Sequence, residues 1–205
     1  MHAPGYHETL FSRIYPGKQD SGSTYLPVLE ALDSSLKLSP AQKQRTILRT
    51  DADFGGDANV NSALQRDWQV LAKGKGGRRP LAYAQQIAEA DWQDLGHQRW
   101  VAPAVVAPHY LRPTQHLVLR WHTTTGLVKY STLVCSIMDG DQAAIVTYYD
   151  DRGSAETEIK ADKAGLKLER RRKKQLAAQE ALVLLTDLAH NLLAWSSQWL
   201  FTTPP

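Results

Sequence analysis

The segment from Tyr149 to Lys163 holds the residues best suited to chemistry. On an α-helix that advances about 100° per residue, Arg152, Glu156 and Lys163 fall within roughly 40° of one another. Lys160 lies about 40° further round, so one face offers a single carboxylate among three cations. A carboxylate suits a hard divalent cation and the cations suit phosphates, so the pattern favours a metal-assisted phosphodiester site. Salt bridging between Glu156 and Lys160 on a surface helix fits the spacing equally well.

A metal site needs a second carboxylate, and Asp51 is the best placed candidate. It follows a predicted buried strand and precedes a loop that contains glycine, a position that holds a ligand rigidly. Asp51, Asp53 and Asp57 also resemble the start of an EF-hand calcium loop. The fifth position is Gly55 and the twelfth is Ser62 instead of the bidentate glutamate, so we reject calcium binding there. Turn formation by Asp51 and helix capping by Asp57 are the structural alternatives.

Positive charge is concentrated in two segments of a chain whose formal net charge is +3. Residues 71–80 carry +4 and residues 158–174 carry +5, which leaves −6 on the remainder. Basic clusters on an otherwise acidic chain are typical of a protein that binds a polyanion, because neutralised phosphates release their condensed counterions. A solvated helix face is the alternative explanation. The basic residues are Lys73, Lys75, Arg78 and Arg79 in the first segment, and Lys160, Lys163, Lys167, Arg170, Arg171, Arg172, Lys173 and Lys174 in the second.

Hydrophobic periodicity predicts an α/β fold. Strands and helices alternate in the first part of the chain, and helices return after residue 153. Between them, residues 99–149 are rich in Val, Thr, Trp and Tyr, with hairpin-like breaks at 125–126 and 139–140, as in an antiparallel β section. The expected strands are 10–15, 45–50 and 68–72, and the expected helices are 23–38, 57–67, 81–90, 153–163 and 170–200.

Composition narrows the class of protein. With 205 residues, 42% of them hydrophobic, the chain can bury a sizeable core, which excludes a disordered tail or a fibre. It has no apolar run long enough for a membrane span and no secretory signal, so we expect a cytoplasmic protein. The single cysteine, Cys135, cannot form an internal disulfide, and no Cys/His pair has the spacing of a zinc site.

Two segments of the sequence resemble a known family. Tyr149, Arg152, Glu156 and Lys163 reproduce the Y-x2-R-x3-E-x6-K signature of bacterial DDE-type insertion-sequence transposases, in the branch that cuts and pastes DNA through hairpin intermediates. Residues 49–54 are similar to the second-aspartate motif of that family, in which a strand-end aspartate is followed shortly by an aromatic residue. The resemblance covers nearly the whole chain.

The resemblance implies an RNase H-like catalytic core, incomplete at the N-terminus, with an antiparallel β insertion and a long C-terminal helix. It divides the chain into a partial core with the second acidic residue (1–98), the β-rich insertion (99–149) and a helical part with the third acidic residue (150–205). Such a core binds two divalent metals, normally Mg2+ or Mn2+, about 4 Å apart, and cleaves and rejoins DNA at transposon ends.

The resemblance also implies roles for individual residues. Asp51 would be the second acidic residue and Glu156 the third, both catalytic metal ligands. The implied partners are double-stranded DNA at transposon ends and a second copy, as a homodimer or a dimer with full-length transposase, and the DNA-bound protein would be nucleoid-associated. The residues expected to contact DNA phosphates, from the motif and from the basic run, are Tyr149, Arg152, Lys160, Lys163, Arg170, Arg171 and Arg172.

The chain departs from the family at two places. Asp53 stands where the family usually has glycine. The first aspartate of the family lies on a strand upstream of residues 10–15, and neither Asp20, in a predicted turn, nor Asp33, in a predicted helix, is a convincing substitute. We therefore expect a transposase fragment that is inactive alone. The alternatives are a non-catalytic DNA-binding or dimerising remnant that inhibits intact transposase, and a host RNase H-like nuclease.

Overall fold

The computed structural model describes residues 2–3, 8–16, 20–106, 109–153, 157, 160, 164–165 and 174–201. They belong to two compact units, one formed by Asp20–Tyr149 and the other by Met1–Gln19 with Asp150–Pro205. The first unit holds a mixed β-sheet with its helices, and the second is built on one long helix.

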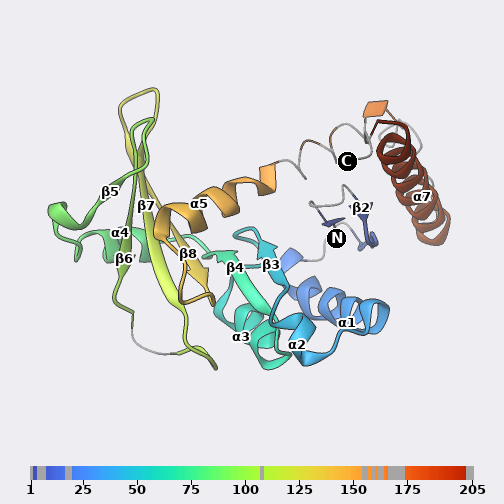
Figure 1. Cartoon of the computed structure of the whole chain (residues 1–205), viewed down its shortest axis with the longest axis horizontal. Coiled ribbons are helices and arrows are strands. Elements are labelled where there is room, and N and C mark those ends of the chain that lie inside the picture. The colour runs from blue at the N-terminus through green and yellow to red at the C-terminus, as the bar shows by residue number, and fades with distance from the viewer. Residues whose placement is uncertain are drawn as a thin grey trace. The chain divides into compact units, whose positions relative to one another are not determined.

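A six-stranded sheet forms the centre of the Asp20–Tyr149 unit (Figure 1). Its strand order is β3-β4-β8-β7-β6-β5; β3 and β4 run parallel, and the other neighbouring pairs are antiparallel. The predicted α/β class is confirmed, and the antiparallel strands join the same sheet as β3 and β4. The strands are β3 (Ile47–Thr50), β4 (Gln69–Lys73), β5 (Gln93–Asp94), β6 (Arg99–Ala104), β7 (Gln115–His122) and β8 (Val128–Cys135).

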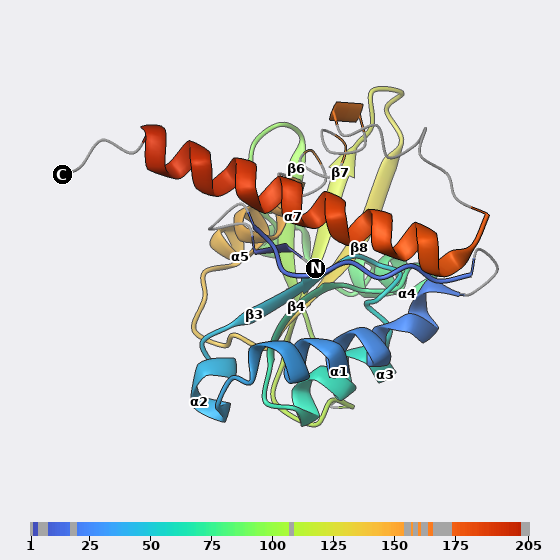
Figure 2. The same cartoon turned by 90° about the vertical axis from the view of Figure 1, so that its right-hand side faces the viewer.

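Helices cover both faces of this sheet. Helices α1 and α3 lie side by side next to β3 and β4 in both views of the chain (Figures 1 and 2), and α4 contacts β7 and β8. The described helical elements of this unit are η2 (Ser21–Thr24), α1 (Tyr25–Leu36), α2 (Pro40–Lys43), α3 (Asp57–Gln65), α4 (Arg79–Ala84), η3 (Glu89–Asp91) and α5 (Gln142–Asp150).

Strand β4 is buried on both sides, because its side chains alternate between two cores. Val70 and Ala72 belong to the side covered by α3, whereas Leu71 belongs to the side covered by α5. The buried thiol of Cys135 packs in the second core, as expected for a lone cysteine. The residues of the second core are Leu71, Val101, Leu117, Leu119, Leu133, Cys135, Ile145, Val146 and Tyr149.

The prediction that the β section extends to residue 149 is wrong after β8, because residues 142–150 form helix α5. Its β-branched and aromatic residues favour a strand in isolation. Asp141 instead caps a helix, since its carboxylate accepts a hydrogen bond from the Ala144 N–H (3.0 Å). Ile145 and Tyr149 then fall on one buried face, four residues apart, so packing against the sheet overrides the local preference.

The second unit is built on helix α7 (Leu176–Phe201), which confirms the predicted long C-terminal helix, together with the short strands β1 (His2–Ala3) and β2 (Glu8–Thr9). The strand predicted at residues 10–15 is absent, because that segment makes side-chain contacts to α7 instead of a ladder. Asn191 exchanges two hydrogen bonds of 2.8 Å with the backbone of Thr9, and Ser12 donates to Asp187 (2.9 Å).

Candidate functional site

The carboxyl end of β3 carries Asp51, where the sequence predicted a metal ligand. The Oδ1 atom of Asp51 accepts hydrogen bonds from the N–H groups of Asp53 (3.1 Å) and Phe54 (3.3 Å). This is the turn geometry expected of an aspartate that ends a strand, so the structural alternative is confirmed for this oxygen. The same two bonds fix the rotation of the carboxyl group and leave Oδ2 without a hydrogen-bond partner among the described residues.

The loop after Asp51 lies directly against the end of β4. Gly55 is buried there, and a Cβ atom added to it would stand 1.7 Å from the carbonyl oxygen of Lys73. The Gly55 carbonyl accepts a hydrogen bond from the N–H of Lys75 (3.3 Å). The carboxyl ends of parallel strands meet at one edge of a sheet, and here the loops that follow β3 and β4 are joined backbone to backbone.

Arg49 connects β3 to Tyr148, the residue that directly precedes the Tyr149 motif. Its guanidinium lies over the ring of Tyr148, 4.5 Å from the centroid, and also donates to the Tyr148 carbonyl. Arg49 is the last but one residue of β3, and Asp51 directly follows the end of that strand. The strand that Asp51 follows is therefore in contact with the residue that directly precedes the signature segment.

The described residues of the signature have different surroundings. Tyr149 is 7% exposed and packs in the core between α5 and the sheet. Arg152 is half-buried, and Lys160 is exposed in a helical segment. Their roles in phosphate binding stay predictions. The other residues assigned to the site, Glu156, Lys163, Arg170, Arg171 and Arg172, lie outside the described residues.

The donor chemistry of Asp51 fits the Mg2+ or Mn2+ that the family resemblance implies. Hard divalent cations take carboxylate oxygens, and Oδ2 of Asp51 is such an oxygen on a fixed carboxyl group. Within the described part of the chain, no group of three His, Cys, Asp or Glu side chains is arranged to hold a metal. The described residues therefore offer one carboxylate oxygen of the kind that such a cation prefers, and not a complete set of ligands.

A polar cluster that the sequence did not predict surrounds Asp57. The expected capping role is wrong, because Gly56 occupies the N-cap and Asp57 is the first residue of α3. Its carboxylate accepts hydrogen bonds from Arg79 (2.8 and 3.0 Å) and from the hydroxyl of Tyr110 (2.9 Å), and His109 Nε2 lies 3.7 Å away. Burial alone would raise the pKa of Asp57, but these hydrogen bonds outweigh it and hold the pKa below its ordinary value.

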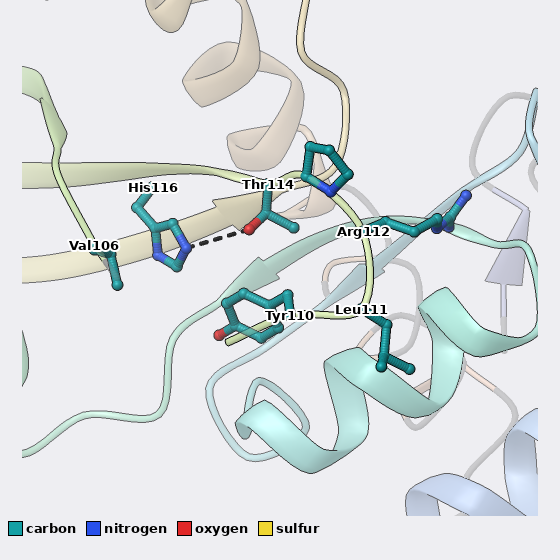
Figure 3. A pocket seen from close by; sticks show the side chains of 7 residues that line it. Val106, Tyr110, Leu111, Arg112, Thr114 and His116 are labelled. Carbon is teal, nitrogen blue, oxygen red and sulfur yellow. Dashed lines mark hydrogen bonds between the residues drawn. The ribbon is translucent and has the colours of Figure 1, made fainter. Parts of the chain in front are cut away.

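His116 lies beside Tyr110 of this cluster and lines a hollow of about 440 Å³ (Figure 3). Its ring stacks on Tyr110 with 5.4 Å between centroids, and its Nε2 is 3.3 Å from the hydroxyl of Thr114. Burial, followed by the nearby His109, lowers the pKa of His116 to about 4, and Asp57 opposes this shift. The imidazole is therefore neutral near pH 7. No signal in the sequence points to this cluster, because the residues come from separate elements.

We expect His116 to make the folded state less stable as the pH falls from 6.5 towards 4. The unfolded chain takes up a proton near pH 6.5, whereas the folded chain takes it up only near pH 4. Protonation therefore favours unfolding throughout this window. NMR titration of the His116 imidazole and urea unfolding at several pH values measure the effect, and His116→Gln removes the corresponding slope. A folded-state titration of His116 near pH 6.5 would contradict the prediction.

Comparison of the chain with protein families and with curated proteins finds no match. No helix in the described ranges is long and apolar enough to cross a membrane.

Proposed function

We propose that this chain carries the second and third acidic residues of a DDE-type transposase catalytic domain with an RNase H-like core. Asp51 and Glu156 are metal ligands in this proposal, and the substrate is double-stranded DNA at transposon ends. The reaction is metal-dependent phosphodiester hydrolysis followed by strand transfer. The contact of Arg49 with Tyr148 supports the proposal best, because it holds β3, the strand that Asp51 follows, against the residue that directly precedes the signature segment.

In the proposed reaction, the metals and the side chains of the protein make different contributions. The bound metals supply a Lewis acid that activates the attacking oxygen and stabilises the leaving oxygen. The turn at Asp51 fixes one carboxylate before any substrate binds, which reduces the reorganisation needed at the reacting phosphate. Arg152 and Lys160 are proposed to hold phosphates, together with Lys163 and the arginines of the basic run.

A third carboxylate is needed to complete the proposed site. Asp20 caps η2 by accepting a hydrogen bond from the Ser23 N–H (3.2 Å), and Asp33 binds two cations and an indole N–H. Both side chains already have structural partners. The proposal therefore assigns catalysis to this chain in combination with a first acidic residue from an additional segment or partner, such as a full-length transposase in a mixed dimer.

Asp51→Asn tests the proposal without disturbing the loop. Asparagine keeps the Oδ1 acceptor that the N–H groups of Asp53 and Phe54 require, but it removes the negative charge and the second carboxylate oxygen. We expect Mn2+ to broaden amide NMR signals near both Asp51 and Glu156 in the parent chain. Asp51→Asn should weaken this effect by roughly tenfold or more in Mn2+ concentration.

Asp53→Asn is the matched control, because Asp53 is exposed two residues away and the charge change is identical. It should leave the Mn2+ response unchanged, whereas Glu156→Gln should reproduce the loss seen in Asp51→Asn. If Asp51→Asn responds to Mn2+ like the parent chain, the metal site is not at Asp51. Binding of DNA without any Mn2+ response would instead support the non-catalytic remnant.

A further inference from the structure

The loop that connects β4 to α4, together with the residue on each side of it, is rich in basic side chains and largely exposed to solvent. Lys73, Lys75, Arg78 and Arg79 stand in seven consecutive residues that contain no acid, and the intervening positions are glycines. Residues 75–79 are exposed. A Cβ atom added at Gly76 or Gly77 would meet no atom within 4 Å, so this surface is open to a large ligand.

Only one of these four cations has a counter-charge in the described part of the chain. Arg79 binds the carboxylate of Asp57 through two hydrogen bonds. The side chains of Lys73, Lys75 and Arg78 make no ion pair or hydrogen bond with the described residues. Three positive charges so close in the sequence, without a counter-charge among the described residues, repel one another, and a bound polyanion relieves that repulsion.

The backbone of this loop is held against the Asp51 loop. Lys75 donates its N–H to the Gly55 carbonyl (3.3 Å), and Gly74 donates its N–H to the Thr132 carbonyl of β8 (2.8 Å). A Cβ at Gly74 would stand 2.2 Å from the Thr132 hydroxyl oxygen, so a larger residue there would require the Thr132 side chain to move. The loop that carries the basic side chains therefore leaves the sheet at the same edge as Asp51.

We propose that Lys75 and Arg78 bind the phosphates of a DNA strand at the edge of the sheet that carries Asp51. The proposal rests on the transposase function and adds a phosphate-binding element separate from the signature segment. An exposed ammonium and an exposed guanidinium suit phosphate oxygens, the first as a point charge and the second as a fork of N–H donors. The glycines between them allow the DNA backbone to approach the loop closely.

Fluorescence anisotropy with a labelled 20-base-pair DNA duplex tests the loop directly, in EDTA and at 50 to 200 mM NaCl. The double variant Lys75→Gln/Arg78→Gln should bind roughly tenfold more weakly at about 0.1 M salt. The slope of log K against log salt should lose about 1.8 in magnitude, because each lost phosphate contact removes about 0.9.

The double variant Lys37→Gln/Arg45→Gln is the control, because it lowers the net charge equally. Both of these residues are exposed and lie before β3, whose carboxyl end carries Asp51. Its affinity and salt slope should stay close to those of the parent chain. Equal losses in the two double variants would overturn the proposal, because they would show a response to net charge alone.

Asp51→Asn separates this inference from the proposed function, since EDTA removes the metal. Its DNA affinity in EDTA should equal that of the parent chain or exceed it slightly. Weaker DNA binding by Lys75→Gln/Arg78→Gln, together with a full Mn2+ response in Asp51→Asn, would support DNA binding by the loop and contradict metal binding at Asp51. An unchanged salt slope in Lys75→Gln/Arg78→Gln would contradict phosphate binding by Lys75 and Arg78, whatever the Mn2+ result.

Discussion

Gly55→Ala is expected to destabilise the Asp20–Tyr149 unit by about 3 kcal/mol, the upper end of the range for overpacking a tight site. The added methyl group would stand 1.7 Å from the Lys73 carbonyl oxygen and 2.8 Å from its carbon. Both are backbone atoms, and Lys73 is paired with Leu133 of β8, so β4 cannot yield without breaking the sheet. The loop would have to leave β4. Urea unfolding followed by far-UV circular dichroism measures the loss.

Gly56→Ala is the natural control for this prediction. A Cβ atom at Gly56 meets nothing within 4 Å, so only the modest preference for glycine over alanine at an N-cap opposes it. We expect a change within about 1 kcal/mol. Equal stability of the two variants would show that the Asp51 loop is not pressed against β4. Where Gly55→Ala remains folded, it should weaken both the Mn2+ response and DNA binding, because the Asp51 and Lys75 loops meet at this glycine.

The elements nearest the candidate site could be predicted from the sequence, because they follow strong local signals. The buried strand before Asp51 and the helix after Gly56 correspond to β3 and α3, and the strand after Asp67 corresponds to β4. Asp51 itself could be chosen because it stands between a short apolar strand and a glycine-containing loop. These features depend on a few neighbouring residues, so hydrophobic periodicity and turn-forming residues in the sequence are enough to predict them.

Contacts between distant segments could not be predicted in the same way. Arg49 meets Tyr148 because the chain returns to β3 through α5, and Asp57 meets Tyr110 because the segment between β6 and β7 passes the start of α3. Helix α5 could not be predicted for the same reason. Its residues favour a strand locally, and the helix is stabilised by the packing of Ile145 in the core. Among the described residues, Arg79 is the one cation of the basic loop with a counter-charge, and this is also a structural result, because the sequence does not reveal its pairing with Asp57.

Asp33→Ala is expected to destabilise the same unit by about 3 kcal/mol. The Asp33 carboxylate, 19% exposed, binds Lys43 (2.6 Å), Arg66 (3.1 Å) and the indole N–H of Trp68 (3.0 Å). Trp68 is fully buried, so its N–H would lose its partner away from water. Asp33→Asn keeps one acceptor and should cost less. Glu30→Gln is the control, because Glu30 is 57% exposed and its contact with Arg66 is worth about 1 kcal/mol or less.

The pH dependence of the stability lost in Asp33→Asn measures how much of that loss is electrostatic. Burial alone would raise the pKa of Asp33, but hydrogen bonds from Lys43 and Trp68 outweigh it and lower the pKa below 3.8. The ionised carboxylate is therefore favoured in the folded state, and its stabilisation is complete above pH 5 and lost as the pH falls through the folded pKa. The stability difference between the parent chain and Asp33→Asn should be constant from pH 5 to 7 and should shrink below about pH 4. A difference that does not change with pH would mean that packing, not charge, holds α1 against α3 and β4.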